Sequence, residues 1–537
     1  MKYVFVSGGV ISRVGKGTVS SSVGAMLRAR GYDVTHMKID FYMNCKLDMK
    51  EMCEHGEVRV FEDAHECDMD FGIFMRLGAI GLMRESGVEC DGMADDLVRR
   101  GDPRMGKAPY ANPGVIDGAV RRIVKAGEKE MDDLSGGKKT GEIVVVEFGG
   151  LIAERESSLY LEIFSKLQTS VGKENCMLVG VECITELDVE QHKLEKIAMG
   201  TRRLEEHGLR YNVLVCRVGK ELDGGFVKKI EEQCLIADGC VYSLPDMDSM
   251  YLVPGYLEKR GCGEKIAHIL RIENRVVRIE MMSAIERIGR AQGSTVRIGL
   301  IGRATNVFDS CASVIHALNF SAGMLGVRAE VVWIDAEGIE KGVGYEDVDG
   351  CDGLVIPGGF GPRGVEGNIK VIEYARINGI PLLGICMGYQ LAVIEMSRNI
   401  LGIKNASSEE LVGEEGDLVI RLIEDENGKR NGMLRVGGHE IVIMDGRIKQ
   451  MYKRSNVKER HIHRYEVCKE VAGRLEQKGI RFVGKSLNGM NMKAFEMDGH
   501  PFFVGVQYHP ELNAKPDVPH PLFTGFISAC YEMQKGR

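Results

Sequence analysis

The chain has 537 residues, of which 44 % are hydrophobic and 28 % are charged, and its formal net charge is -8 with a pI near 6.0. This length is too great for one hydrophobic core, so we expect two or more domains. The acidic balance argues against a general nucleic-acid-binding protein, and no apolar run approaches the roughly 18 residues of a membrane span.

The first residues of the sequence and the distribution of its cysteines bear on the cellular location of the protein. Residues 1–9 lead directly into a short strand and a glycine turn, without the basic, apolar and small-residue regions of a signal peptide. The 15 cysteines are dispersed and form none of the paired CxxC sets that are typical of zinc sites. These features predict a cytoplasmic protein with reduced thiols.

Short apolar runs alternate with amphipathic stretches along almost the whole chain. The runs lie at 3–6, 143–146, 177–181, 213–216, 296–301, 331–334, 354–356 and 502–506. Continuous β-branched runs separated by helical patterns are typical of parallel sheets that are covered by helices on both faces. We therefore predict an α/β protein with two doubly wound domains and mainly parallel sheets.

The first glycine-rich turn lies at residues 8–18, between an apolar strand and an amphipathic helix that starts near Thr18. Its glycines, including Gly15 and Gly17, let backbone amides surround phosphate oxygens. The helix N-terminus adds a positive dipole, and Lys16 adds a point charge. Five residues rather than four separate Gly9 from Gly15, so the spacing is not the strict Walker A form, and a purely structural turn stays open as an alternative.

Two acidic residues follow at positions suited to a metal that accompanies a nucleoside triphosphate. Asp70 lies in an acidic segment, and Glu147 ends the apolar strand 143–146, where open α/β sheets place ligands. Magnesium is typically held by one or two carboxylates together with phosphates and water. Considered alone, each residue is more often an ordinary surface or loop acid.

The domain boundary is expected near residue 295. Residues 271–294 are charged and helical in pattern, with no obvious strand, and the apolar run at 296–301 starts a new α/β unit.

The strongest local signal is the sequence Gly384-Ile385-Cys386-Met387-Gly388, which follows an apolar strand and precedes a helical pattern. This is the cysteine form of the nucleophile elbow, a sharp turn whose small flanking residues leave the side chain exposed to a substrate. The N-terminus of the following helix favours a thiolate over a thiol.

A thiolate nucleophile needs a base and a group that orients the base. His509 lies near the end of another strand and can exchange protons with Cys386, while Glu511 can orient its imidazole. The glycine turn at 358–361 and the amide of Met387 can donate to a developing oxyanion. A single histidine or cysteine is usually structural, but three such features at three strand ends indicate a catalytic site.

With these motifs in order, the chain resembles the glutamine-hydrolysing CTP synthase family over nearly its whole length. The supporting motifs, besides the Cys386 elbow, are GGVIS at 8–12, GKG at 15–17, KID at 38–40, EHGEV at 54–58, DMD at 68–70, EFGG at 147–150, VCR at 215–217, GGFG at 358–361, EE at 409–410, LRVG at 434–437, ERHIHRYEV at 459–467 and HPE at 509–511. The resemblance implies an ATP-dependent synthetase (amidoligase) domain at 1–270 with a P-loop-like fold, a helical linker at 271–295 and a class I glutamine amidotransferase domain at 296–537.

The resemblance implies the following chemistry. ATP phosphorylates the uracil O4 of UTP, glutamine is hydrolysed at Cys386 through a thioester, and ammonia passes internally and displaces the phosphate to give CTP. It also implies a homotetramer that can assemble further into filaments, activation by GTP, inhibition by CTP, and no nucleic-acid or membrane partner.

Residue roles are implied in the same way. The phosphates of ATP would be bound by Ser12, Gly15, Lys16, Gly17, Lys38 and Asp70, and magnesium by Asp70 and Glu147. UTP or CTP would be bound by Ser12, Glu154, Glu156, Lys193 and Lys229. Glutamine would be held by Gly359, Met387, Gln390, Glu410 and Arg464, with the oxyanion at Gly358, Gly359 and Met387 and with Cys386, His509 and Glu511 as the catalytic residues.

The differences from the family's motifs concentrate in the segments that would recognise UTP. The family's Lys-Thr-Lys-Pro-Thr-Gln segment is KLEKIA at 193–198, where Glu195 would repel phosphate and Ala198 cannot bond a base. The segment at 149–157 also differs, and Asn112-Pro113-Gly114 lacks a usual histidine. In the glutaminase motifs the main loss is one arginine, replaced by Ile462. Two alternatives therefore stay open: an amidoligase with a different acceptor, and a synthetase-impaired regulatory paralogue that assembles with an authentic CTP synthase.

Overall fold

The structure is a computed structural model that describes residues 1–9, 14–40, 59–61, 63–67, 70–77, 86–89, 113–128, 130–132, 138–140, 142–152, 157–184, 190–290, 293–302, 311–413, 415–423 and 434–536. Two compact units are present. The first contains the described residues up to Arg290, except the short segments 59–61 and 63–67, which belong with the residues from 293 onward in the second. The domain limits derived from the family resemblance stay a prediction.

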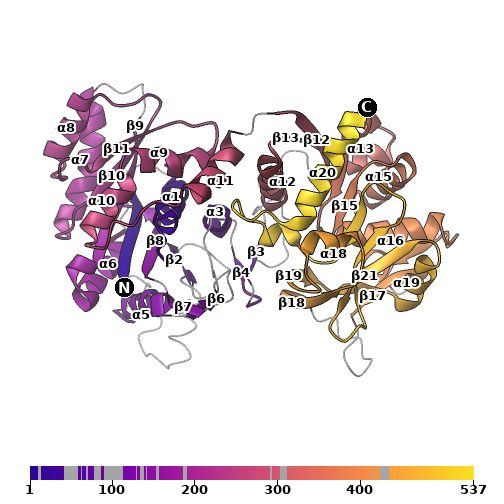
Figure 1. Cartoon of the computed structure of the whole chain (residues 1–537). Coiled ribbons are helices and arrows are strands. Elements are labelled where there is room, and N and C mark those ends of the chain that lie inside the picture. Colours follow the sequence, from indigo (N-terminus) through magenta and orange to yellow (C-terminus); the bar gives the residue numbers. More distant parts are fainter. Residues whose placement is uncertain are drawn as a thin grey trace. The chain divides into compact units, whose positions relative to one another are not determined.

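The first unit is built on a seven-stranded parallel sheet (Figure 1). Its strands, in spatial order, are β11 (Val241–Pro245), β10 (Val213–Val218), β9 (Cys176–Ile184), β1 (Lys2–Gly8), β8 (Ile143–Leu151), β2 (Val34–Asp40) and β5 (Gly87–Glu89). On one side of β1 the strands follow in chain order, β9, β10 and β11, and on the other side lie β8, β2 and β5. Because β1 and β8 are parallel neighbours, the loops after them meet at the carboxyl edge of the sheet, where open α/β sheets bind ligands.

Helices cover both faces of this sheet. Tyr3 and Phe5 of β1 pack on one face against α5 (Pro113–Glu128), α6 (Ser157–Val171), α7 (Glu190–Glu206) and α8 (Gly224–Gln233). Val4 and Val6 pack on the other face against α1 (Lys16–Ala29), α9 (Val253–Lys259) and α10 (Cys262–Ile269). Because successive side chains of a strand point to opposite faces and both faces are buried, the central strands are mainly apolar.

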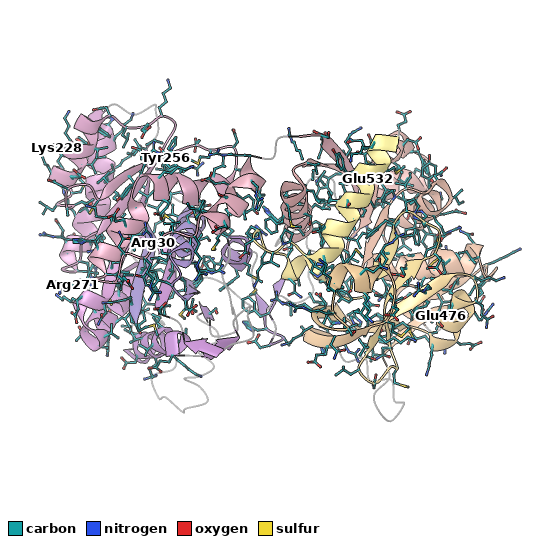
Figure 2. All side chains as sticks on the ribbon, in the orientation of Figure 1. Arg30, Lys228, Tyr256, Arg271, Glu476 and Glu532 are labelled. Atoms are coloured by element: carbon teal, nitrogen blue, oxygen red, sulfur yellow. The ribbon has the colours of Figure 1, made fainter. Side chains whose placement is uncertain are left out.

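The remaining elements of this unit are short. They are α3 (Asp70–Arg76), α11 (Ile279–Gly289), the 3-10 helices η3 (Lys173–Asn175) and η4 (Met250–Leu252), and a hairpin of β6 (Glu130–Asp132) with β7 (Lys138–Thr140). The segment before α11 is tied to α1 through buried Arg30 (Figure 2), which forms an ion pair with Glu258 and donates to Asn274 at 2.5 Å.

The second unit contains a nine-stranded mixed sheet. Its spatial order is β13 (Arg328–Asp335), β12 (Thr295–Gly302), β14 (Gly353–Ile356), β15 (Leu382–Ile385), β23 (Phe503–Val506), β22 (Met492–Met497), β21 (Ile480–Ser486), β18 (Arg435–Ile443) and β19 (Asn456–His463). Pairing is parallel from β13 to β23 and antiparallel from β23 to β19. The predicted α/β fold with mainly parallel sheets is confirmed, and the antiparallel extension is an addition to it.

Helices also cover the parallel part of this sheet. One face carries α13 (Ala336–Glu340), α15 (Val365–Asn378), α16 (Met387–Asn399) and α19 (Lys469–Glu476), and α14 (Tyr345–Asp349) follows α13. The helix α12 (Ala312–Leu325) packs with α20 (Pro521–Gly536), and α20 lies against β12 and β14. The smaller elements are α17 (Glu409–Val412), α18 (Arg447–Tyr452), η6 (Pro510–Asn513), a sheet of β16 (Ala406–Ser408), β17 (Asp417–Leu422) and β20 (Tyr465–Val467), and the pair β3 (Arg59–Val60) and β4 (Glu66–Cys67). None of the helices in the described part of the chain has both the length and the apolar character needed to cross a membrane.

Phe495 tests the core of the second unit, because its buried ring contacts Tyr389, Phe482 and Phe503. We expect Phe495→Ala to lower the free energy of unfolding of this unit by about 3–5 kcal/mol, through lost apolar burial and the cavity left behind. Urea denaturation followed by the fluorescence of Trp333, the single tryptophan, measures the change. Ile377→Ala on the exposed side of α15 is the control, and an equal effect of both variants would contradict this packing.

Candidate active sites

The turn between β15 and α16 holds Cys386 in an uncommon backbone conformation, with φ 52° and ψ -100°. A non-glycine residue in such a conformation costs on the order of 1–3 kcal/mol and persists only where its surroundings enforce it. The flanking glycines make the turn possible. A β-carbon on Gly388 would lie 2.2 Å from the carbonyl oxygen of Ile356, and a β-carbon on Gly384 would lie 2.8 Å from the carbonyl oxygen of Gly388. The structure therefore has the geometry of a nucleophile elbow.

The Cys386 thiol is buried and has polar neighbours. Its sulfur lies 3.6 Å from the carbonyl oxygen of Ile462 and 3.7 Å from Nε2 of Gln507. The backbone N–H of Cys386 donates to Val506 at 2.8 Å, which links the elbow to β23. Because β15 and β23 are neighbours in the sheet, the residues that follow both strands lie close together.

His509 follows β23 and is paired with Glu511, with 2.7 Å between Nδ1 and Oε1. The carboxylate accepts this bond, so Nδ1 carries the proton. Among the described residues no group makes a hydrogen bond of ordinary geometry to the buried Nε2. Burial lowers the pKa of His509, but the charges of Glu511 and the Cys386 sulfur outweigh it and raise the pKa well above its usual value. The site therefore favours an imidazolium beside the sulfur.

The glycine turn after β14 reaches the same place. A β-carbon on Gly358 would lie 2.7 Å from Cε1 of His509 and 3.5 Å from Cβ of Cys386, so only glycine fits. Gly359 is the next residue of this turn, and Met387 is the first residue of α16. The predicted catalytic residues and the predicted oxyanion turn are thus brought together.

Three residues predicted to hold glutamine lie around Tyr465. The side chain of Gln390 donates to the Tyr465 carbonyl at 3.3 Å. Burial and the negative charges of Glu410 and Glu409 raise the pKa of the Tyr465 phenol, and the positive charge of Arg464 partly offsets this rise. Glu410 also accepts from the Gly361 amide at 3.2 Å, which connects it to the glycine turn.

Gln507 was missed as a site residue by sequence reasoning. It is fully buried, it lies against the Cys386 sulfur, and its Oε1 accepts from Gln390 at 3.2 Å. The available signal was its position, since it is a polar residue directly after the buried strand β23 and two residues before His509.

The second candidate site lies at the carboxyl edge of the sheet in the first unit. Gly15 has φ 88° and precedes α1, and Lys16, the first residue of that helix, donates to the carbonyls of Gly149 and Gly150 at 2.7 Å each. Lys16 thus joins the loop after β1 to the end of β8, which are the two places where the predicted phosphate and metal residues lie.

Lys38, Glu147 and Asp40 add buried charge to this edge. Lys38 of β2 is opposite Glu147 of β8 in the sheet register, and its ammonium lies 3.4 Å from Asp40. A β-carbon on Gly17 would lie 3.6 Å from Oε2 of Glu147, so this carboxylate faces the start of α1. Asp40 was not predicted as a site residue, although it ends the quoted KID motif.

Only some of the predicted nucleotide-binding residues lie in the described part of the chain. Lys193 lines a cavity of about 290 Å³ together with Lys220 and Asp223, whereas Lys229 is exposed on α8 and does not line it. Ser12, Glu154, Glu156 and the side chain of Asp70 lie outside the described residues. Within the described part of the chain no group of three or more His, Cys, Asp or Glu side chains is arranged around a metal position.

Two family models match the chain. Residues 2–272 match the model described as CTP synthase N-terminus, and residues 306–529 match glutamine amidotransferase class-I. A protein named CTP synthase from Encephalitozoon cuniculi is 46 % identical over 539 residues, covering 100 % of both chains, and one from Methanopyrus kandleri is 34 % identical over 541 residues, covering 99 % of both. The glutaminase domain of Trypanosoma brucei CTPS with bound acivicin is 32 % identical, covers 44 % of this chain and 94 % of that chain, and has a TM-score of 0.41.

The His509–Glu511 pair can be tested without assuming a reaction. We expect Glu511→Gln to slow the alkylation of Cys386 by iodoacetamide at pH 7 about tenfold or more, because the imidazolium that supports the thiolate loses its counter-charge. Mass spectrometry of the Cys386 peptide gives the rate. Glu476→Gln, on the exposed surface of α19 (Figure 2), is the matched control. An unchanged rate in a folded Glu511→Gln protein would show that Glu511 does not act on this pair.

Proposed function

The chain belongs to the CTP synthase family, and from this premise we propose that it converts UTP to CTP with ATP and with ammonia that it releases from glutamine. It is accordingly an ATP-dependent carbon–nitrogen ligase. Similarity over the full length of the relatives favours this function over a different acceptor and over a purely regulatory paralogue. The observation that carries the glutaminase half is the meeting of Cys386, His509 and Gly358 at adjoining strand ends.

In the glutaminase half, the Cys386 thiolate attacks the side-chain carboxamide carbon of glutamine. The amides of Gly359 and Met387 stabilise the oxyanion, and the His509 imidazolium gives its proton to the departing ammonia. Water then attacks the thioester, with His509 as the base, and glutamate and the free thiolate are released. Glu511 keeps the imidazole in one tautomer and orientation.

We propose that Gln390, Glu410 and Arg464 hold the amino-acid end of glutamine. A carboxylate and a guanidinium are the natural partners for its ammonium and carboxylate groups. Glu410 accepts from the Gly361 amide of the glycine turn, and Gln390 donates to the carbonyl of Tyr465, the residue that follows Arg464.

In the synthetase half, we propose that Lys16 and Lys38 bind the phosphates of ATP, with Gly15 and Gly17 leaving room for the backbone to approach them. Glu147 fits magnesium, because it is a nearly buried carboxylate at the sheet edge that faces the start of α1, and Asp70 is proposed to share the ion. Bound magnesium would neutralise phosphate charge during transfer. The proposed UTP residues are Ser12, Glu154, Glu156, Lys193 and Lys229.

Several finer properties are proposed from family membership alone. They are activation by GTP, inhibition by CTP, a homotetramer with further assembly into filaments, and a cytoplasmic location.

The synthetase half can be tested without the glutaminase. The purified protein is incubated with ATP, magnesium, UTP and ammonium, and CTP is measured by chromatography. Ammonia bypasses Cys386, so we expect CTP to form despite the departures at 193–198. If a folded protein that binds ATP makes no CTP, UTP is not the acceptor and the proposed function is wrong.

The two sites can be separated by substitution. We expect Cys386→Ala to reduce glutamine-dependent CTP formation by about 10³-fold or more, as loss of a nucleophile does, while ammonia-dependent formation is retained. Glu147→Gln should instead reduce both reactions together, because it acts on the shared synthetase step. Equal loss of both activities in folded Cys386→Ala would contradict the two-site scheme.

A further inference from the structure

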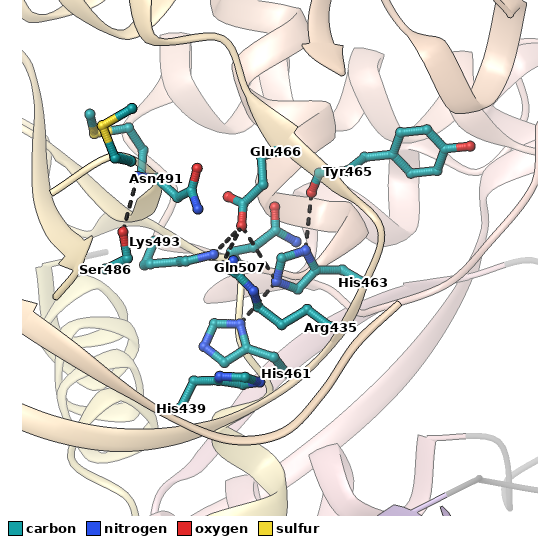
Figure 3. Close-up of polar contacts among 12 residues, drawn as sticks. Arg435, His439, His461, His463, Tyr465, Glu466, Ser486, Asn491, Lys493 and Gln507 are labelled. Atoms are coloured by element: carbon teal, nitrogen blue, oxygen red, sulfur yellow. Dashed lines mark hydrogen bonds and ion pairs between the residues drawn. The ribbon is translucent and has the colours of Figure 1, made fainter. Parts of the chain in front are cut away.

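A buried ionic cluster lies two strands away from the Cys386 strand in the sheet and has no part in the mechanism above. Lys493 of β22 is 1 % exposed, and its ammonium is paired with the Glu466 carboxylate of β20. Arg435 of β18 reaches the same carboxylate oxygen at 3.1 Å, so the three side chains converge from three strands (Figure 3). Burial of an ammonium carries a large desolvation penalty, and a buried ion pair is weak grounds for a purely stabilising role.

The neighbouring histidines add no charge to this cluster. His463 donates from Nδ1 to the Tyr465 carbonyl at 3.1 Å, which leaves its Nε2 as the acceptor for Nδ1 of His461 at 3.0 Å (Figure 3). Burial, reinforced by the charge of Lys493, holds the pKa of both rings well below the usual value, so both are neutral. His439, whose pKa burial also lowers, is held by the Val436 carbonyl at 3.0 Å.

The cluster therefore carries one excess positive charge. Tyr389 of the neighbouring helix α16 is a neutral phenol, because burial raises its pKa well above the usual value and its hydroxyl donates to the Met492 carbonyl at 3.0 Å. One ammonium and one guanidinium share the single carboxylate of Glu466, which leaves a net charge of one positive unit.

The sheet register places Lys493 in the same row as the nucleophile, with Gln507 between them. Val506 lies opposite Ile385 on β15 and opposite Ala494 on β22. The next residue after Val506 is Gln507, whose backbone N–H donates to the Lys493 carbonyl at 2.9 Å and whose side-chain Nε2 lies 3.7 Å from the Cys386 sulfur. Cys386, Gln507 and Lys493 thus form one row across three adjacent strands.

The Lys493 ammonium and the Cys386 sulfur interact electrostatically. Burial lowers the pKa of Lys493 and the Glu466 carboxylate raises it, and the Cys386 sulfur also raises it, with a result of about 8. A positive charge in a buried site favours a negative charge on a nearby group, here the Cys386 sulfur.

We propose that Lys493 is a positioning residue of the glutaminase, which supplies positive charge that stabilises the Cys386 thiolate while Gln507 holds the sulfur by a hydrogen bond. The inference rests on the proposed function in that Cys386 is taken as the nucleophile. Lys493 itself does not touch the substrate; it acts through the sulfur.

A pH effect follows from this arrangement. The ammonium is present below about pH 8 and is lost as the pH rises through that value, so its support of the thiolate is lost there. The rate of Cys386 alkylation by iodoacetamide should therefore show an inflection near pH 8 in addition to the titration of the Cys386–His509 pair. A structural ion pair would produce no such inflection.

The test is the alkylation rate of Cys386 from pH 5 to 10 in the full-length protein. We expect Lys493→Met to slow alkylation at pH 7 about tenfold and to remove the inflection near pH 8. It should lower kcat for glutamine hydrolysis more than it raises KM. Lys485→Met, on the neighbouring strand β21, is the matched control and should match the wild type.

The double variant Lys493→Met with Glu466→Gln separates charge from packing. It leaves Arg435 as the remaining charge of the cluster, so alkylation at pH 7 should recover toward the wild-type rate while the inflection stays absent. A double variant no faster than Lys493→Met would overturn the proposal. If Lys493→Met does not fold, as judged by Trp333 fluorescence, the double variant decides by itself: a rate near wild type without the inflection supports the proposal, and a retained inflection rejects it.

Failure of the inference and failure of the proposed function give different results. If Cys386→Ala retains glutamine hydrolysis, Cys386 is not the nucleophile and the proposed function is wrong. If Cys386→Ala abolishes hydrolysis while Lys493→Met keeps the wild-type alkylation profile, the inference about Lys493 alone is wrong.

Discussion

The chemistry of the second unit depends on the backbone conformation of Cys386. A positive φ at a non-glycine residue is unfavourable by itself, and here the hydrogen bond to Val506 and the close approach of Gly388 to Ile356 hold it in place. A strand in this sheet would direct its side chains to one face or the other, where helices cover them. The turn instead directs the sulfur to the strand edge, where the histidine after β23 can meet it.

Because the site is buried, its charged groups need opposite charges close by. A thiolate and an imidazolium are each disfavoured in a buried site, and their mutual attraction is one part of the compensation. Glu511 supports the imidazolium through a 2.7 Å hydrogen bond, while the positive cluster at Lys493 lies on the side of the thiolate. Each charge of the pair therefore has its own opposite charge, and these two supports come from different strands.

Much of the fold could be predicted from sequence, and the exceptions have a common cause. Strands buried on both faces, such as β1 and β9, are continuous apolar runs and were recognised. The antiparallel strands β18 and β19 are partly exposed and contain Arg, His, Glu and Lys, so they give no such signal. In the active site, Cys386 and His509 were found because Cys386 directly follows β15 and His509 lies three residues after the end of β23, each within a short motif. Lys493 and Glu466 were not, because they lie 27 residues apart on different sheets and meet only through tertiary packing.

The two units illustrate how one architectural rule serves two kinds of chemistry. In the parallel part of both sheets the carboxyl ends of neighbouring strands converge, and loops there collect side chains that are distant in sequence. In the first unit this edge gathers lysines and carboxylates, Lys16, Lys38 and Glu147, which suit phosphates and a divalent ion. In the second unit the antiparallel extension brings Lys493, Arg435 and the histidines of β19 to the flank of the elbow. The extension therefore does more than enlarge the sheet, because a purely parallel sheet would end at β23 and leave the thiolate without charged neighbours on that side.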